Sequence, residues 1–324
     1  MKCLIIQPIH PAGEKMLREA GIEPVNASAH DMGTVAREIA GMDAAITRNA
    51  GLDRAAMDAG DRLRVIGNHG TGVDQVDLDH ATEINLPVAY IPHANVQSVA
   101  ELAIAHMMAI ARRVREADAA VRSGNFDYRY ARDFREMQGS TLLIIGFGSI
   151  GRRTAEMAAA AFAMKVLVHS PSVPVEKIVE AGFEPAPDLG EALGKADFVS
   201  LHQRLNDRTR ASFNAERFAR MKKGAVLVNT ARGGLVDAAA LIKAVESGQL
   251  RGAAIDVFET EPLPVDHPFI GCKGILLAPH IGAATEEALE RMAVEIATAV
   301  IAVLRGERPE YLANPDTWEV RRRI

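Results

Sequence analysis

Short runs of apolar residues alternate along the chain with segments that carry a helical pattern. In the first part of the chain, apolar runs at residues 3–6, 44–47, 65–67 and 88–91 predict strands. Amphipathic segments separate these runs, for example at residues 13–20 and 31–40. Strands that alternate with helices usually form parallel sheets, so this order predicts an α/β fold.

A second series of the same kind begins near residue 142. Its strands are expected at residues 142–146, 166–169, 198–202, 225–229, 253–257 and 275–278. Helices are expected between them, for example at residues 152–162 and 238–247, and a long helix at 286–304. Two α/β series in one chain predict two domains, and a small ligand would be expected in the cleft between them.

The segment that joins the two series has a different character. An Ala-rich pattern predicts one long helix from about residue 96 to residue 121, and an irregular piece follows at 125–138. In that piece aromatic residues alternate with arginines. Two interpretations stay open: a surface loop with packed aromatics, or an arm that docks on a second subunit.

The sequence GFGSIG at residues 146–151 follows the apolar run 142–145 and precedes a helical pattern. In this context Gly146 permits a tight turn, Gly148 lets the backbone approach a pyrophosphate, and Gly151 lets the helix pack close to the strand. The N-terminus of the helix adds N–H groups and a positive dipole end. The segment therefore predicts a binding site for a nicotinamide dinucleotide.

The end of the next strand, residues 166–169, is where an acidic residue normally binds the adenosine ribose of NAD. The chain continues there with Ser170, Pro171 and Ser172, without Asp or Glu. Repulsion of a 2′-phosphate is then absent, and the serine hydroxyls can donate to phosphate oxygens. Nearby positive charge would come from Arg152, Arg153 or Lys177. Both NAD and NADP therefore remain open as the cofactor.

Three charged residues lie at or just beyond predicted strand ends: Arg232, Glu261 and His280. Because the carboxyl ends of parallel strands line the ligand crevice, we expect these side chains to converge. Reduction of a 2-oxo acid needs a proton donor beside the carbonyl oxygen, which suits histidine near pH 7. A carboxylate orients the imidazole, and a guanidinium binds a planar carboxylate through two parallel hydrogen bonds.

Composition narrows the function classes further. The chain has 324 residues, 48% of them hydrophobic, and a formal net charge of −5, so no nucleic-acid surface is indicated. Its two cysteines, Cys3 and Cys272, belong to no metal-binding cluster, and no metal site is expected. The apolar stretch at the N-terminus is too short for a signal peptide, and no run reaches membrane-spanning length. We expect a cytoplasmic protein without membrane contact.

Six ordered motifs resemble those of the D-2-hydroxyacid dehydrogenases. This family includes phosphoglycerate dehydrogenases, glyoxylate/hydroxypyruvate reductases, and D-lactate and formate dehydrogenases. The motifs are GTGVD at 70–74, NVQSVAE at 95–101, GFGSIG at 146–151, NTARGG at 229–234, DVFETEP at 256–262 and PHIG at 279–282. The resemblance runs through essentially the whole chain. It implies two Rossmann-like domains: a flavodoxin-like substrate domain of residues 1–98 and 287–324, and an NAD(P)-binding domain of residues 99–286.

The resemblance also implies roles for individual residues. His280 would be the acid/base, Glu261 its partner, and Arg232 the contact of the substrate carboxylate and carbonyl. Substrate binding would add Arg48 and the backbone N–H groups of Gly70 and Thr71. The expected cofactor-binding residues are Gly146, Gly148, Ser149, Ile150, Gly151, Ser170, Thr230, Ala231, Arg232, Asp256, His280 and Gly282.

Two departures from the family pattern concern the cofactor. Ser170 stands at the position of the ribose-binding Asp, and Gln203-Arg204 replaces the usual apolar residue and Pro. Arg204 either points to solvent or helps to hold an adenosine 2′-phosphate. The expected reaction is hydride transfer between NAD(P)H and a small 2-oxo acid such as glyoxylate, hydroxypyruvate or a phosphoglycerate-like acid, in a homodimer.

Two alternatives compete with this activity. One is a catalytically weak NAD(P)-sensing binding protein of the same fold. The other is a sugar-nucleotide-modifying enzyme, which would require a Tyr-x-x-x-Lys pair. None of the tyrosines at 90, 128, 130 and 311 has a Lys four residues later.

Overall fold

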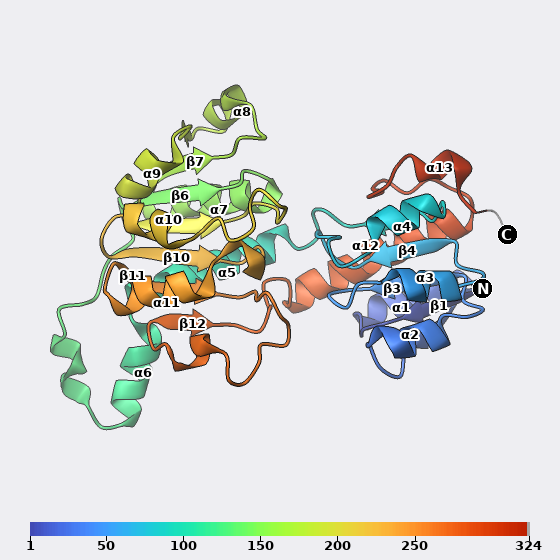
Figure 1. The fold of residues 1–324 in the computed structure, drawn as a ribbon, viewed down its shortest axis with the longest axis horizontal. Helices are drawn as coiled ribbons and strands as arrows, with labels where there is room; N and C mark the ends of the chain where they lie inside the picture. The colour runs from blue at the N-terminus through green and yellow to red at the C-terminus, as the bar shows by residue number, and fades with distance from the viewer. Residues whose placement is uncertain (323–324) are drawn as a thin grey trace. The chain divides into compact units, whose positions relative to one another are not determined.

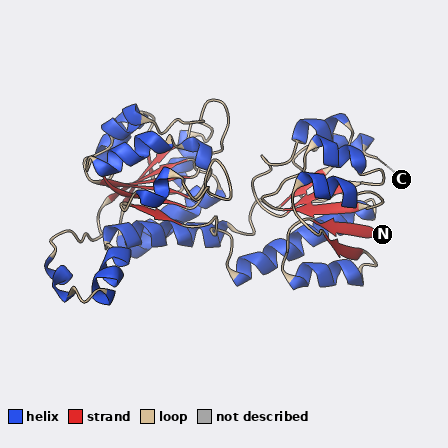
Figure 2. Cartoon of the chain, turned by 60° about the horizontal axis from the view of Figure 1, so that its bottom comes forward, coloured by secondary structure: helices blue, strands red, loops and turns tan. Residues whose placement is uncertain are grey.

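The computed structural model describes residues 1–322, which form two compact units. One unit comprises Met1–Asn95 and the part of the chain from Ala284 onward, and the other comprises Val96–Ala283. Within each unit, helices cover both faces of a parallel sheet (Figure 2). The α/β prediction with two parallel sheets is therefore confirmed.

The sheet of the first unit has five strands in the order β2-β1-β3-β4-β5. The strands are β1 (Lys2–Ile5), β2 (Glu23–Asn26), β3 (Ala44–Thr47), β4 (Val65–Asn68) and β5 (Val88–Tyr90). The helices are α1 (Pro11–Glu19), α2 (Met32–Glu38), α3 (Arg54–Ala59), α4 (Leu78–Glu83), α12 (Glu286–Leu304) and α13 (Thr317–Val320). The order reverses between β1 and β3, which makes this the switch point where parallel sheets bind ligands.

Helix α12 belongs to the core of the first unit although it lies far along the chain. Two glycines allow its close approach. A Cβ at Gly67 of β4 would lie 2.8 Å from Cγ2 of Val300, and one at Gly13 of α1 would lie 2.8 Å from the carbonyl oxygen of Ala293. Real side chains do not tolerate such contacts, so glycine at these positions sets how closely α12 packs.

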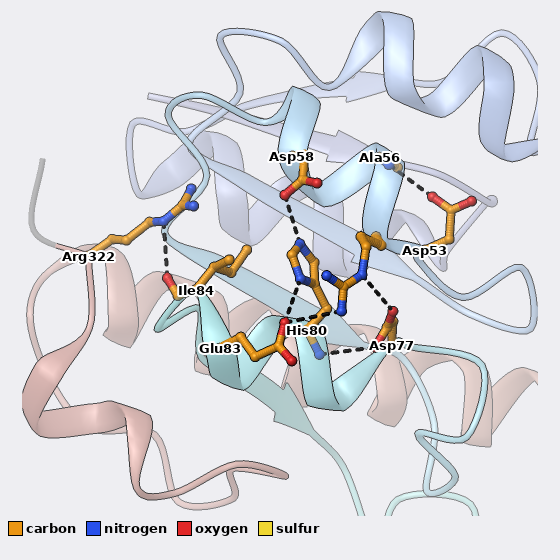
Figure 3. A network of polar contacts seen from close by, with 9 residues as sticks. Asp53, Ala56, Asp58, Asp77, His80, Glu83, Ile84 and Arg322 are labelled. Carbon is orange, nitrogen blue, oxygen red and sulfur yellow. Dashed lines mark hydrogen bonds and ion pairs between the residues drawn. The ribbon is translucent and has the colours of Figure 1, made fainter.

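A polar network ties α3 to α4 on the surface of the same unit (Figure 3). The buried imidazole of His80 lies between Asp58, 2.7 Å from Nε2, and Glu83, 3.3 Å from Nδ1. Arg54 of α3 donates to the same Glu83 at 3.1 Å. Asp77 caps α4 by accepting the backbone N–H of His80. Because every member contacts two helices or a helix end, the network fixes α3 against α4.

The sheet of the second unit has seven strands in the order β12-β11-β10-β9-β6-β7-β8. The strands are β6 (Thr141–Ile145), β7 (Lys165–His169), β8 (Glu184–Pro185), β9 (Phe198–Leu201), β10 (Ala225–Asn229), β11 (Leu250–Ile255) and β12 (Ile275–Leu277). The helices are α5 (Val96–Ala111), α6 (Val114–Arg122), α7 (Ser149–Phe162), α8 (Val175–Glu180), α9 (Leu189–Lys195), α10 (Ala215–Arg220) and α11 (Ala238–Glu246). Here the strand order reverses between β6 and β9.

The single helix predicted from residue 96 to about 121 is wrong. The structure has α5 and α6 instead, because Arg113 between them adopts a left-handed conformation with φ of 50°. Its guanidinium bonds to Asp133, which is also bound by the buried Arg251. Arg251 donates in addition to the carbonyl of Ala111 at the end of α5. These hydrogen bonds lie at the break between α5 and α6 and offset the conformational free energy that the left-handed residue Arg113 costs.

Beyond this break, residues 114–134 form an arm that extends away from the sheet of their own unit (Figure 1). The arm contains α6 and a 3₁₀ turn, Phe126–Tyr130, and neither has a buried residue. Its exposed apolar side chains include Val121, Phe126 and Tyr130. In the described residues, no helix combines the length and apolar character needed to cross a membrane, and no cluster of potential metal ligands is present.

Candidate active site

The glycine-rich turn joins β6 to α7 at the switch point of the second sheet. Gly146 has φ of 94°, and a Cβ there would lie 2.6 Å from the backbone nitrogen of Gln203, just beyond β9. A Cβ at Gly151 would lie 2.1 Å from the carbonyl oxygen of Gly146. Only glycine fits either place, so the predicted tight turn and the close contact of helix and strand are both observed.

Gly148 differs from the other two glycines because a Cβ there would meet nothing within 4 Å. It is the N-cap of α7, a helix of 14 residues that begins with Ser149 and Ile150. The turn therefore leaves open space in front of a helix N-terminus, next to backbone N–H groups. This cradle fits a pyrophosphate, which needs backbone donors and no intervening side chain.

Ser170 and His169 share the end of β7, but their side chains do different things. The hydroxyl of Ser170 accepts the backbone N–H of Phe147 at 3.1 Å, and Ser170 is buried. This bond braces the glycine turn. His169, which sequence analysis did not single out, donates from Nδ1 to the carbonyl of Ala186 at 2.8 Å and lines a pocket of about 900 Å³. Its position as the last residue of the strand was the available signal.

Arg232 lies in the segment that follows β10. The side chain of Asn229 shapes this segment, because its amide accepts the N–H of Ala231 at 3.0 Å and donates to the carbonyl of Arg232 at 2.8 Å. A Cβ at Gly233 would lie 2.0 Å from the carbonyl carbon of Phe258, so the segment packs directly on the chain after β11. Thr230 and Ala231 lie in the same short segment, and the Thr230 hydroxyl is buried without a partner within the described residues.

Glu261 and His280 form the hydrogen bond that their expected pairing requires. Glu261 Oε2 lies 2.7 Å from His280 Nδ1, and Glu261 Oε1 accepts the backbone N–H of Phe258 at 2.9 Å. Burial alone would raise the pKa of Glu261, but the bonds from His280 and Phe258 and the charge of Arg232 hold that pKa below its usual value. Glu261 is therefore a carboxylate at neutral pH and is hydrogen-bonded to Nδ1 of His280. Nε2 is then the ring nitrogen that Glu261 does not contact.

Asp256 holds the loop that carries His280. Its carboxylate accepts the backbone N–H of Ile281 at 2.8 Å and of Gly282 at 2.9 Å, and its own carbonyl accepts the N–H of His280. Burial is the largest influence on Asp256 and raises its pKa. His280 itself has φ of 54°, a conformation unfavourable for a residue with a side chain. The clamp by Asp256 therefore maintains a strained backbone that aims the imidazole.

In the first unit, the expected substrate-binding residues lie at the carboxyl edge of the sheet. Arg48 follows β3 and donates from Nη1 to the carbonyl of Pro8, after β1, at 2.8 Å. This contact spans the switch point. Gly70 and Thr71 follow β4, and the Thr71 hydroxyl bonds to Asn95 at 3.0 Å. His69 beside them is buried, and within the described residues neither of its ring nitrogens has a hydrogen-bond partner.

The candidate residues of the second unit are thus brought to one edge of its sheet. Arg232, Glu261 and His280 follow the adjacent strands β10, β11 and β12, and the glycine turn follows β6. Arg152 and Glu156 pair along α7 at 3.0 Å, while Arg204 is exposed. An imidazole braced by a carboxylate next to a guanidinium can exchange a proton with an oxygen atom while an adjacent carboxylate is held.

Comparisons with known proteins identify relatives of this chain. Residues 104–282 match the family model described as the NAD-binding domain of D-isomer specific 2-hydroxyacid dehydrogenases. The chain is 37% identical over 315 residues to the D-3-phosphoglycerate dehydrogenase of Methanocaldococcus jannaschii, a match of 97% of this chain and 59% of that protein. It is 39% identical over 275 residues to the glyoxylate reductase of Thermofilum pendens, covering 83% of this chain and 80% of that protein.

A solved structure is similar over nearly the whole chain. The NAD-dependent formate dehydrogenase of Staphylococcus aureus, in complex with NAD, superimposes with a TM-score of 0.84 at 27% identity, covering 95% of this chain and 96% of that one. The chain spans 59% of the length of the phosphoglycerate dehydrogenase it matches.

Proposed function

Because the chain belongs to the D-isomer specific 2-hydroxyacid dehydrogenase family, we propose that it transfers a hydride between a nicotinamide dinucleotide and a small 2-oxo or D-2-hydroxy acid. The observation that carries this proposal is the 2.7 Å bond between Glu261 and His280. It is accompanied by Arg232 in the segment after the neighbouring strand. The second unit is the proposed cofactor domain and the first the proposed substrate domain.

His280 is the proposed acid/base. Glu261 holds Nδ1, so Nε2 is the ring nitrogen that gives a proton to the substrate oxygen during reduction or takes it during oxidation. The carboxylate also stabilises the imidazolium, as its own low pKa keeps it charged at neutral pH. Asp256 fixes the loop on which His280 lies. The nicotinamide, when bound, supplies the hydride in the reductive direction.

Arg232 is the proposed contact of the substrate carboxylate and carbonyl. A guanidinium binds a planar carboxylate with two parallel hydrogen bonds and polarises the adjacent carbonyl. On the first unit, Arg48, Gly70 and Thr71 are the proposed substrate-binding residues. Burial lowers the pKa of Arg48, and in the described part of the chain this guanidinium has no acidic partner. An anionic substrate would compensate its charge.

The cofactor site is proposed to comprise the glycine turn, the end of β7 and the loops after β10 to β12. Its residues are Gly146, Gly148, Ser149, Ile150, Gly151, Ser170, Thr230, Ala231, Arg232, Asp256, His280 and Gly282. We propose NADP as the preferred cofactor, because the end of β7 carries no carboxylate to repel a 2′-phosphate.

Homodimerisation through the arm is a further part of the proposal. Val121, Phe126 and Tyr130 are 60%, 64% and 66% exposed on a segment that buries none of its own residues. Exposed apolar side chains gathered on one projecting element favour contact with a second copy. The cytoplasm is the proposed location, in keeping with two cysteines that are both free thiols.

The test is turnover of glyoxylate and hydroxypyruvate with NADPH and with NADH in parallel. We expect His280→Ala to lower kcat by about 10²- to 10⁴-fold, the range typical of a lost general acid, and to lower nucleotide affinity far less than kcat. Arg232→Ala should raise KM as well as lower kcat.

The control is His30→Gln, which replaces an exposed histidine elsewhere in the chain. Near wild-type turnover by His280→Ala would refute the mechanism, and no turnover by the wild type on any 2-oxo acid would favour a nucleotide-sensing protein.

A further inference from the structure

The pocket beside His169 lies where the adenosine end of a dinucleotide is expected. A pyrophosphate at the glycine turn after β6 directs the adenosine ribose toward the end of β7, the next strand in the sheet. Ser170 is turned inward onto Phe147, so its hydroxyl braces the turn. His169 is the residue of this strand end that lines the pocket, with Nδ1 fixed on Ala186.

Four arginines contribute to the walls of this pocket. They are Arg208 and Arg210 in the segment after β9, and Arg217 and Arg220 on α10. The two acidic residues in the same walls already have hydrogen-bond or ion-pair partners. Asp188 caps α9 by accepting the N–H of Glu191, and Glu216 pairs with Arg220 at 2.9 Å. The positive charge of the other three arginines, Arg208, Arg210 and Arg217, is therefore only partly balanced.

Two of the arginines are the least compensated. Arg217 is half-buried, with its guanidinium carbon 5.6 Å from the centre of the Phe213 ring, and its acidic neighbour Glu216 is already paired with Arg220. Arg208 has no acidic partner in the part of the chain that is described. Arg210, by contrast, lies 3.5 Å from Glu259. A pocket with uncompensated guanidinium groups selects an anion, and phosphate oxygens suit their planar donors.

We propose that this pocket binds the 2′-phosphate of the adenosine half of NADP, with Arg208 and Arg217 as its phosphate-binding residues. The proposal rests on the cofactor role proposed above and identifies a site for cofactor choice. The positive charge that would bind the 2′-phosphate comes from the segment after β9 and from α10, and not from the end of β7. Arg204, the arginine of the same segment that the sequence suggested, is exposed and does not line the pocket.

The pocket is tested with two nucleotides that differ only in the 2′-phosphate: adenosine 2′,5′-bisphosphate and adenosine 5′-monophosphate. Calorimetric titration of the full chain should give at least tenfold tighter binding of the bisphosphate. Arg208→Gln and Arg217→Gln should each reduce bisphosphate affinity about tenfold, the effect of one lost charged hydrogen bond, and leave monophosphate affinity unchanged. Arg204→Gln is the matched control and should change neither.

Equal affinity for the two nucleotides, binding of neither, or an equal loss in Arg204→Gln would overturn the proposal. Circular dichroism of each variant separates a lost contact from a lost fold, and Arg208, which is exposed, can be replaced without removing buried packing. The nucleotide measurements need no turnover. If the bisphosphate preference holds but no 2-oxo acid is reduced, the 2′-phosphate site is supported and the proposed reaction is refuted. If a 2-oxo acid is reduced but the bisphosphate is not preferred, only the 2′-phosphate site is refuted.

Discussion

Individual residues show how the surroundings of a side chain decide its chemistry. His280 and His69 both follow a strand end in parallel sheets, yet their surroundings differ. His280 is hydrogen-bonded to the carboxylate of Glu261. His69 is buried without a partner in the described residues and lies near the positive charge of Arg48; burial, with that charge, lowers its pKa to about 4. Neighbouring groups thus place one residue type in two different environments, a carboxylate-bound one and a buried one.

Buried neutral histidines make the protein sensitive to acid. Burial lowers the pKa of His106 to about 4, as it does that of His69. Between pH 6.5 and pH 4 the unfolded chain binds protons at these sites that the folded chain excludes, so stability falls as pH decreases and the loss is complete below pH 4. At pH 5 each site costs about 2 kcal/mol. We expect His106→Leu to flatten the decline of Tm between pH 7.5 and pH 5.

The control is His30→Gln, an exposed histidine whose replacement should leave the slope of Tm against pH as it is in the wild type. Calorimetric melting curves at several pH values are the measurement. A His106→Leu slope as steep as that of the wild type would assign the acid sensitivity to other groups.

Among the elements, those with strong apolar patterns were predictable and those held by distant contacts were not. β3, β10 and α12 occur as predicted because each carries an uninterrupted apolar pattern. The edge strands β2 and β8 were not predicted, since edge positions bury few side chains and both contain proline. The break at Arg113 depends on Asp133 and Arg251, the latter 138 residues farther along the chain, so local sequence favoured one continuous helix.

The same division holds for the candidate site. Motif spacing predicted the glycine turn, and the geometry of Gly146 and Gly151 bears out the physical reason for each glycine. The roles of Ser170 and His169 were not predictable, because adjacent residues of a strand point to opposite sides and the sequence does not say which side faces the ligand. The pocket arginines come from the segment after β9 and from α10, so the sequence alone does not show that they line one pocket.

The arm is the element whose role is most directly testable. Its base is fixed by Asp133 and Arg251, so its apolar residues are presented on a firmly held segment. We expect Phe126→Asp with Val121→Asp to convert a dimer to a monomer in analytical ultracentrifugation. The control is Val179→Asp on α8, which is 58% exposed and lies outside the arm. Dissociation by the control as well, or an unchanged mass in the arm variant, would contradict dimerisation through the arm.

At the scale of the whole molecule, two compact units predict two separable responses to mutation. Val300 on α12 is fully buried against the first sheet, whereas Thr298 lies on the exposed face of the same helix. We expect Val300→Asp to destabilise the first unit by about 3 kcal/mol or more, because it buries an unpaired charge, and Thr298→Asp to have little effect. Hydrogen exchange followed by mass spectrometry should show the loss confined to the first unit.

Affinity for adenosine 2′,5′-bisphosphate should survive in Val300→Asp, because the proposed pocket consists only of residues of the second unit. A parallel loss of nucleotide binding would mean that the two units do not unfold independently.

The placement of α12 in the core of the first unit has a consequence for biosynthesis. β1 to β5 leave the ribosome early, but the helix that covers β4 at Gly67 is encoded after the whole of the second unit. Until residue 304 has emerged, the nascent first sheet exposes the apolar surface that α12 will cover. The second unit is contiguous and can complete its fold sooner, so the unit whose translation starts earlier is the one that matures later.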